Sequence, residues 1–182
     1  MRMPSGFKVK EKNTRQVRFE ANIAREQILG VVKVGSIAEV APDKLLEHLD
    51  GFGIEVQVIE KDSQEIGEDV PAAMVGHVLK IRDPIYKGMC DKEPRDVFTL
   101  YHELGHHFLK HERSMNRGQF EEHMWIEDSE WQANTFASEI LMPLDEIKAN
   151  RYTSIFDLVD AYGVSCDAAR IRLEKLRQQG EI

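Results

Sequence analysis

Four of the chain's seven histidines lie in thirteen residues, TLYHELGHHFLKH, which run from Thr99 to His111. Within this segment, His102, Glu103 and His106 form an HExxH pattern. Apolar residues recur around it at helical spacing, so we expect a helix from about Pro94 to Lys110 that is buried on most faces. Imidazole and carboxylate groups rarely enter such a helix without partners. The fold must therefore supply partners for them.

On a helix, His102 and His106 point the same way, about 6 Å apart. Two imidazole nitrogens at this spacing can bind one zinc ion, and HExxH is a pattern of zinc metalloproteases. Glu103 lies about 100° around the helix from His102, where it can reach a water molecule at the metal and act as a general base. The alternative is a chance pattern on a charged helix face. Gly105 favours the metal, because a glycine that costs a helix about 1 kcal/mol indicates the close approach of another element.

A catalytic zinc site needs a third protein ligand. We expect another helix from about Asp128 to Leu141, and Glu130 falls within its apolar stripe. A carboxylate on a buried face needs a partner, and zinc would be one. The alternative is that Glu130 caps the helix or pairs with an arginine. The stripe itself consists of Ala133, Phe136, Ala137, Ile140 and Leu141.

Other polar residues of these two helices are assigned by their positions on the helical wheel. Asn134, one turn after Glu130, could hydrogen-bond a metal ligand. Glu139 lies about opposite Glu130 and is expected to face solvent. His107 and His111 point away from the metal pair and are expected to be partly exposed residues.

The remaining elements follow from the same periodicities. We expect residues 1–14 and the polar segment from Glu112 to His123 to be loosely held, and RDPIYKG, from Arg82 to Gly88, to form a turn. His77 falls in the second expected strand, where it could contact a substrate or serve as a hydrogen-bonded structural residue. The expected helices are Gln16 to Leu29, Pro42 to His48, Ser154 to Tyr162 and Asp167 to Gln178, and the expected strands are Ile54 to Glu60 and Ala73 to Ile81.

Composition limits the class of protein. The chain has 182 residues, enough for one domain with a real core, and no apolar run near the roughly 20 residues of a membrane span. The first residues, MRMPSGFKVK, precede no apolar core, and Cys90 and Cys166 form no CxxC pair. We therefore expect a cytoplasmic protein. Cys90 could coordinate zinc in a latent state, but an ordinary thiol is the simpler interpretation.

The last two expected helices, joined by a tight turn at Gly163, have the pattern of a helix-turn-helix. A DNA-binding role would follow from their basic residues. Asp167 and Glu174 dilute that basic face, and the formal net charge of the chain is -8. Direct DNA binding is therefore not expected. The basic residues of the last helix are Arg170, Arg172, Lys175 and Arg177.

Two blocks, FTLYHELGHHFLKH from Phe98 to His111 and EWQANTFASEILMP from Glu130 to Pro143, resemble the ImmA/IrrE family of metallopeptidases. The resemblance implies a zincin-like α+β fold, in which a small sheet packs on the HExxH helix and the following helix. It implies zinc bound by His102, His106 and Glu130, with Glu103 as the base. Such proteins cleave or inactivate a helix-turn-helix repressor and so switch on mobile-element or stress genes.

We therefore expect a zincin-like metallopeptidase domain in residues 1–150 and a helix-turn-helix-like extension, packed on it, in residues 151–182. The expected activity is zinc-dependent hydrolysis of a peptide bond in a protein substrate. The alternative is a regulatory module that binds and sequesters a repressor without cutting it. Glu103 favours the enzyme, because a structural zinc site has no need of a base.

Overall fold

The computed structural model describes residues 6–111 and 123–182. Most of this part of the chain is helical, with one small sheet, so the predicted α+β class is confirmed. The helices are α1 (Thr14–Val32), α2 (Pro42–Glu47), α3 (Asp83–Cys90), α4 (Pro94–Phe108), α5 (Ser129–Leu141), α6 (Leu144–Asn150), α7 (Ile155–Tyr162) and α8 (Cys166–Gln178). The strands are β1 (Glu55–Ile59), β2 (Ala72–Val75) and β3 (Val78–Arg82), and short 3-10 turns span Ile37–Glu39, Leu49–Phe52 and Trp125–Glu127.

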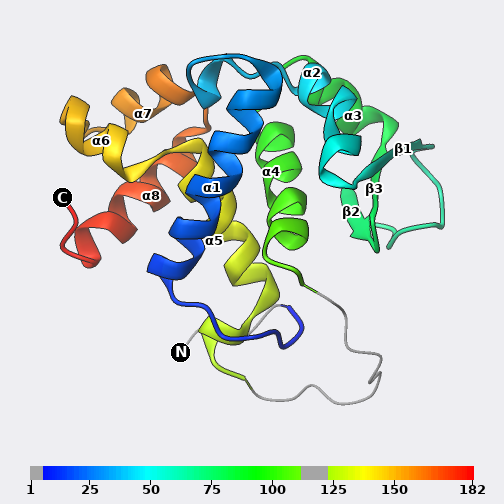
Figure 1. Ribbon diagram of the computed structural model, residues 1–182, viewed down its shortest axis with the longest axis horizontal. Helices are drawn as coiled ribbons and strands as arrows, with labels where there is room; N and C mark the ends of the chain where they lie inside the picture. Colours follow the sequence, from blue (N-terminus) through cyan, green and yellow to red (C-terminus); the bar gives the residue numbers. More distant parts are fainter. Residues whose placement is uncertain (1–5, 112–122) are drawn as a thin grey trace.

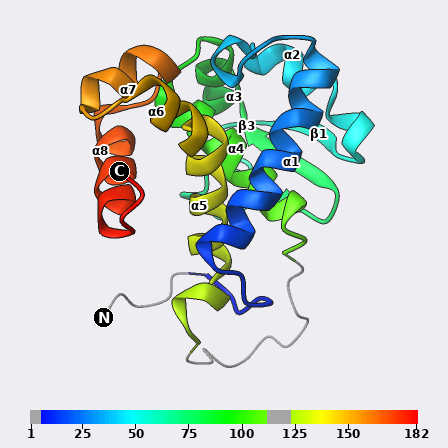
Figure 2. The same cartoon turned by 60° about the vertical axis from the view of Figure 1, so that its left-hand side comes forward.

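The HExxH helix α4 lies at the centre of the molecule. It packs against α5 on one side and against β2 on the other, and α5 in turn packs against α1 (Figure 1). The view turned by 60° also shows α1 and α5 side by side (Figure 2). Apolar residues at helical spacing were expected to form the buried face of each of these helices, and in α1 and α5 all of them are buried: Val17, Ala21, Ala24 and Ile28 in α1, and the five residues of the α5 stripe. In α4, Leu100, Tyr101 and Leu104 are buried, whereas Val97 and Phe108 of the same predicted stripe are partly buried.

The sheet has the strand order β1-β3-β2, with β1 parallel and β2 antiparallel to β3. The single strand predicted from Ala73 to Ile81 is wrong, because the chain reverses at Gly76 and His77 to form the β2–β3 hairpin. Gly76 has φ +64°, which glycine adopts without strain at the first central position of a two-residue turn. The hairpin makes β2 an edge strand and places it beside α4.

The turn predicted from Arg82 to Gly88 is also wrong, because this segment forms α3. Pro84 occupies the first turn of α3, where its missing N–H is not needed. Gly88 lies inside the helix because α4 passes close by, and a β-carbon there would lie within bonding distance of the Asp96 carboxylate. Close packing of two helices therefore overrides the poor helix propensity of DPIYKG.

The C-terminal helices contact the rest of the chain through both members of the pair, α7 at the Ile37–Glu39 turn and α8 at Glu139 of α5. The helices predicted from Ser154 and Asp167 are present as α7 and α8, which pack together and are separated at Gly163 in a left-handed conformation, φ +64°. The preceding helix α6 was not predicted, because Pro143 ends the pattern of α5 and only seven residues follow in α6. The division of the chain at residue 150 stays a prediction.

Residues 6–12 were expected to be loosely held and are instead paired with the start of α5. Lys8 forms a β-bridge with Asp128, and the Val9 N–H donates to the Glu127 carbonyl at 2.8 Å. The polar loop predicted from Glu112 lies outside the described residues up to position 122. Among the described helices, none has the length and apolar character required to span a bilayer.

Candidate metal centre

Helix α4 presents His102 and His106 on one face. Pro94 occupies its first turn, and the two histidines follow one helical turn apart. Their ring centroids are 4.9 Å apart, and their Nε2 atoms approach to 3.1 Å. Both side chains are mostly buried, with 15% and 12% of their surface exposed. The predicted pairing of the two imidazoles is therefore present.

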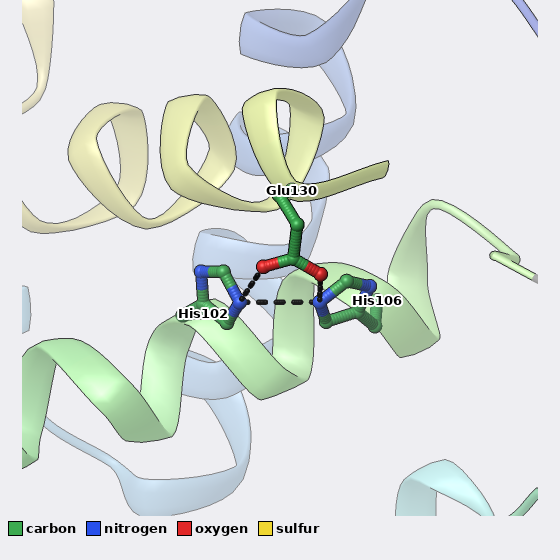
Figure 3. Close-up of side chains that lie close together, drawn as sticks. All are labelled: His102, His106 and Glu130. Atoms are coloured by element: carbon green, nitrogen blue, oxygen red, sulfur yellow. Dashed lines mark hydrogen bonds and ion pairs between the residues drawn. The ribbon is translucent and has the colours of Figure 1, made fainter. Parts of the chain in front are cut away.

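Glu130 reaches the same point from the first turn of α5. Asp128 caps that helix with its side chain, so Glu130 lies at the positive end of the helix dipole. Its Oε2 lies 3.2 Å from His102 Nε2, and its Oε1 lies 3.4 Å from His106 Nε2 (Figure 3). Within residues 6–111 and 123–182, these three side chains are the one group of His, Cys, Asp or Glu whose ligand atoms converge closely enough to hold a metal ion.

Gly105 permits the close packing of α4 and α5. A β-carbon at this position would lie 3.1 Å from Phe136 Cδ1 and 3.2 Å from the Ala133 Cα, tighter than ordinary van der Waals contact. The expectation that another element approaches Gly105 is confirmed. This short distance between the helix axes allows a side chain as short as glutamate to bridge from α5 to both histidines.

The second ring nitrogen of His102 has the predicted partner. His102 Nδ1 lies 3.2 Å from Asn134 Oδ1, one turn along α5 from Glu130. An amide oxygen only accepts hydrogen bonds, so Nδ1 carries a proton, and Nε2 is the ring nitrogen left available to a metal ion. Asn134 therefore orients the imidazole of His102.

His111 was predicted to point away from the metal pair, and this is wrong. The prediction assumed that the helix continues through Lys110, but α4 ends at Phe108. Lys110 adopts a left-handed conformation, φ +57°, and the His111 N–H donates to the His106 carbonyl at 2.9 Å. This turn folds the chain back, so that His111 Nδ1 lies 3.0 Å from His106 Nδ1. Burial lowers the pKa of His111, which favours the neutral imidazole.

Glu103 lies next to the histidine pair and is directed toward the sheet. Its Oε2 accepts a hydrogen bond of 2.8 Å from the Met74 backbone N–H in β2, and its Oε1 is 3.9 Å from His102 Nε2. The residue is 8% exposed. Burial raises the pKa of Glu103 to about 7, although the charge of His102 and the Met74 hydrogen bond act to lower it. A pKa in this range suits a group that accepts and returns a proton near neutral pH.

The three converging groups perturb one another's protonation. The hydrogen bond from His102 lowers the pKa of Glu130, against the effect of its partial burial. Burial acts to lower the pKa of His102, but the hydrogen bond and charge of Glu130, with the charge of Glu103, raise it above its usual value. These directions show that a positive charge between the three groups is electrostatically favoured.

The donor set fits a zinc ion. Two histidine nitrogens and one carboxylate are the protein ligands of one well-known class of catalytic zinc site. Ligand atoms about 2.0–2.1 Å from a tetrahedral ion lie roughly 3.3–3.4 Å from one another. The two Nε2 atoms are 3.1 Å apart, close to that value, and the two carboxylate oxygens of Glu130 each lie near one of them, at 3.2 Å from His102 Nε2 and 3.4 Å from His106 Nε2. One ligand atom from each of the three residues lies within 4.8 Å of the other two.

Glu139 was predicted to face solvent, and this is wrong. Its side chain is 1% exposed and forms two hydrogen bonds of 2.7 Å with the Arg172 guanidinium of α8. Arg18 of α1 donates a further bond from Nε at 3.0 Å. The wheel argument failed because α8 covers the far side of α5 and supplies a charged partner there.

His77, His107 and Cys90 do not belong to the group of three converging side chains. His77 lies in the β2–β3 turn rather than in a strand, with 73% of its side chain exposed and Glu55 at 4.0 Å. His107 Nε2 lies 3.1 Å from the Phe52 carbonyl, and the residue is partly exposed as predicted. Cys90 is a free, half-buried thiol near the end of α3. A role for His77 in substrate contact stays a prediction.

A cavity of about 630 Å³ lies between α4, α5 and α8. Asn134, which bonds His102, forms part of its wall. Apolar side chains from all three helices contribute, with Phe98 from α4, Trp131 from α5 and Ile171 from α8. Asn134 therefore links the wall of the cavity to His102, although none of the three converging side chains lines the cavity itself.

The fold and the site together define an α+β protein in which two packed helices converge on a group that could hold a metal ion. The model of the Peptidase_M78 family, described as the IrrE N-terminal-like domain, matches residues 72–174. This match covers more than half of the chain and includes β2, β3, α4 and α5. The chain therefore belongs to this family, and the resemblance inferred from its sequence is confirmed.

No curated protein matches the sequence. Six chains of solved structures match, among them a "Mycobacterium tuberculosis transcriptional regulator" with 16% sequence identity and a TM-score of 0.44. The alignment covers 86% of this chain and 49% of that one, so the chain spans about half the length of the regulator.

Proposed function

We propose that the protein is a zinc-dependent metallopeptidase with a zincin-like fold, acting in the cytoplasm on a protein substrate. The observation that carries the proposal is the convergence of His102, His106 and Glu130, with Glu103 buried beside them. A purely structural metal site requires no additional carboxylate at this position. A family match to a peptidase domain supports the same activity.

His102, His106 and Glu130 would hold the ion, and Glu103 lies beside this group, with its Oε1 3.9 Å from His102 Nε2. When bound, zinc supplies Lewis acidity, which polarises a carbonyl group and makes a water molecule more acidic. Glu103 would accept the proton of the attacking water and then deliver it to the leaving amine. The Met74 N–H would hold one oxygen of Glu103, leaving the other for the proton.

The edge of β2 would align the substrate. The Arg82 N–H donates to the Pro71 carbonyl, so Pro71 and Arg82 form a hydrogen-bonded pair of the antiparallel ladder. Such pairs occur at every second residue, so Ala73 also bonds β3. The backbone groups of Ala72 and Met74 therefore point outward, away from β3. The Met74 bond to Glu103 agrees with this assignment. An extended peptide can pair with such an edge, which would bring its backbone past Glu103.

The cavity between α4, α5 and α8 would receive a substrate side chain next to the scissile bond. Its walls carry Phe98, Trp131 and Ile171, and its volume exceeds that of a single aromatic side chain. We infer a preference for a bulky apolar residue at this position of the substrate. In this arrangement the C-terminal helices serve substrate docking, because α8 forms one wall.

The substrate we propose is a helix-turn-helix transcriptional repressor whose cleavage derepresses mobile-element or stress genes. This follows from the family resemblance rather than from the geometry of the site. Direct DNA binding is not part of the proposal, because Arg172 is buried against Glu139 and Arg170 pairs with Glu174 at 3.0 Å. The alternative, a module that sequesters the repressor without cutting it, requires no role for Glu103.

The test is incubation of the zinc-loaded protein with a helix-turn-helix repressor encoded beside its gene, followed by mass-spectrometric mapping of fragments. Glu103→Gln should retain zinc and fold but cut about 10²–10⁴-fold more slowly, because glutamine cannot accept the proton. Equal cleavage by Glu103→Gln would remove Glu103 as the base. If wild type and variant both bind the repressor and neither cuts it, the sequestering module is the correct account.

A further inference from the structure

A chain of hydrogen bonds leads from His106 into the protein interior on the side away from Glu130. His106 Nδ1 lies 3.0 Å from His111 Nδ1, and His111 Nε2 lies 2.9 Å from Gln132 Oε1. Gln132 is fully buried in α5, two residues after Glu130. Neither His111 nor Gln132 belongs to the metal-binding group.

The orientation of the Gln132 amide is fixed by two backbone carbonyls. Its Nε2 lies 2.9 Å from the Lys10 carbonyl oxygen and 2.6 Å from the Ile126 carbonyl oxygen. Carbonyl oxygens only accept hydrogen bonds, so the NH2 group must face them. The reverse orientation would place an oxygen against two oxygens in a dry interior, which is costly. Oε1 therefore faces His111.

The protonation of both histidines follows from this orientation. Because Gln132 Oε1 only accepts, the Nε2 of His111 must carry a proton. A neutral imidazole has one N–H, so Nδ1 of His111 is an acceptor and Nδ1 of His106 must be the donor. His106 then has no proton on Nε2, and its lone pair faces His102 and Glu130.

We propose that His111 and Gln132 are positioning residues that hold His106 in the tautomer required of a metal ligand. They act through His106 and touch neither the metal nor the substrate. Two backbone carbonyls fix the direction of the hydrogen bonds from Gln132 through His111 to His106. One is that of Lys10, in the N-terminal segment paired with the start of α5, and the other is that of Ile126, just before α5. For His102 a single residue serves the same purpose, because Asn134 forms a hydrogen bond with its Nδ1 directly. The inference rests on the proposed metal site.

The first test reads the tautomer in the metal-free protein without any substrate. Long-range ¹H–¹⁵N correlation spectra of histidine-labelled protein should show His106 protonated on Nδ1 and His111 protonated on Nε2. His111→Phe should abolish the single tautomer of His106. Protonation of His106 on Nε2 in the wild type would overturn the proposal. This result does not depend on peptidase activity, so it separates the relay from the proposed function.

The second test measures Zn²⁺ affinity by competition with a chromophoric chelator. His111→Phe should bind about 10–100-fold more weakly, as is typical when a ligand loses its hydrogen-bond partner. His111→Asn should recover most of the loss, because its Oδ1 occupies the place of Nδ1 and can accept from His106. His107→Phe is the matched control and should bind as wild type does, because His107 lies next to His106 on α4 but is bonded to the Phe52 carbonyl. Wild-type affinity in His111→Phe would overturn the proposal.

Discussion

Helix α5 carries two buried or half-buried glutamates nine residues apart, and they have opposite surroundings. Glu130 faces the imidazoles of His102 and His106, at 3.2 and 3.4 Å. Glu139 faces the guanidinium groups of Arg172 and Arg18, at 2.7 and 3.0 Å. One helix thus takes part in two charged clusters, one at each end.

The difference between the clusters lies in the charge of the partners. Arginine is always protonated, so Glu139 is neutralised by the chain itself and its cluster is complete. Imidazoles can instead present lone pairs, as the bonds of His102 and His106 to Asn134 and His111 dictate. Three donors that converge without a fixed cation make a site for one, whereas a carboxylate between arginines makes a structural link.

The sharpest test of this contrast is metal content. Glu130→Ala removes a proposed ligand and should weaken Zn²⁺ binding more than about 100-fold. This exceeds the loss expected when only the hydrogen-bond partner of a ligand is removed. Glu139→Gln should bind zinc as the wild type does wherever it is folded. Elemental analysis after dialysis, together with chelator competition, gives both values. Equal zinc content in the two variants would remove Glu130 from the site.

The same two variants should also differ in the free energy of unfolding, and here Glu139→Gln should show the larger effect. Glu139→Gln leaves the buried Arg172 without its counter-charge, which typically costs about 3–5 kcal/mol of unfolding free energy. Urea unfolding of the metal-free proteins measures this cost, and Glu130→Ala should lose much less. The double variant Glu139→Leu, Arg172→Leu should recover much of the loss, since no unpaired charge remains. A cost below about 1 kcal/mol in Glu139→Gln would contradict the structural role of this cluster.

Acid should remove the contribution of the Glu139 cluster. Burial acts to raise the pKa of Glu139, but the hydrogen bonds and charges of Arg172 and Arg18 lower it below the ordinary 4.5. Hydrogen bonds from Lys148 and Arg18 lower the pKa of Glu181, which joins the same network, to about 2. A carboxyl whose pKa falls on folding stabilises the protein above its unfolded pKa and loses this effect as pH falls through the folded value.

The stability advantage of wild type over Glu139→Gln should therefore be constant well above pH 4.5 and shrink as the pH falls below 4.5, through the lowered pKa of Glu139. Urea unfolding of the metal-free proteins at successive pH values provides the measurement. An advantage that stays unchanged across this range would mean that the glutamate does not titrate with folding.

The smallest expected effect concerns the cavity that lies between the two clusters. Ile171→Asp places a charge on its α8 wall and should raise KM for the cleaved repressor roughly tenfold, with kcat little changed, because an apolar contact is lost. Phe156→Asp, on the exposed face of α7, is the matched control and should leave both constants unchanged. Equal effects of the two variants would exclude the cavity as the docking site for a substrate side chain.

The sequence predicted the parts of the protein that depend on local periodicity. It predicted α1, α4 and α5 with their buried stripes, and the pairing of His102 with His106 follows from the helical repeat alone. The predictions for Gly105 and Asn134 were also correct. Gly105 allows α5 to approach α4, and Asn134 of α5 forms a hydrogen bond with His102 of α4. Strand β1 was predicted from the alternation of apolar and polar residues between Ile54 and Glu60.

The tertiary structure decided which element covers each face. The helical wheel put Glu139 opposite Glu130, but only the fold brings Arg172 and Arg18, 33 and 121 residues away, onto that side. The break of α4 after Phe108, which returns His111 to His106, depends on a left-handed residue that is not a glycine. Sequence periodicity shows which residues share one face of a helix. It does not show which segment packs against that face, because packing and charge pairing between distant segments are satisfied only when the whole chain is folded.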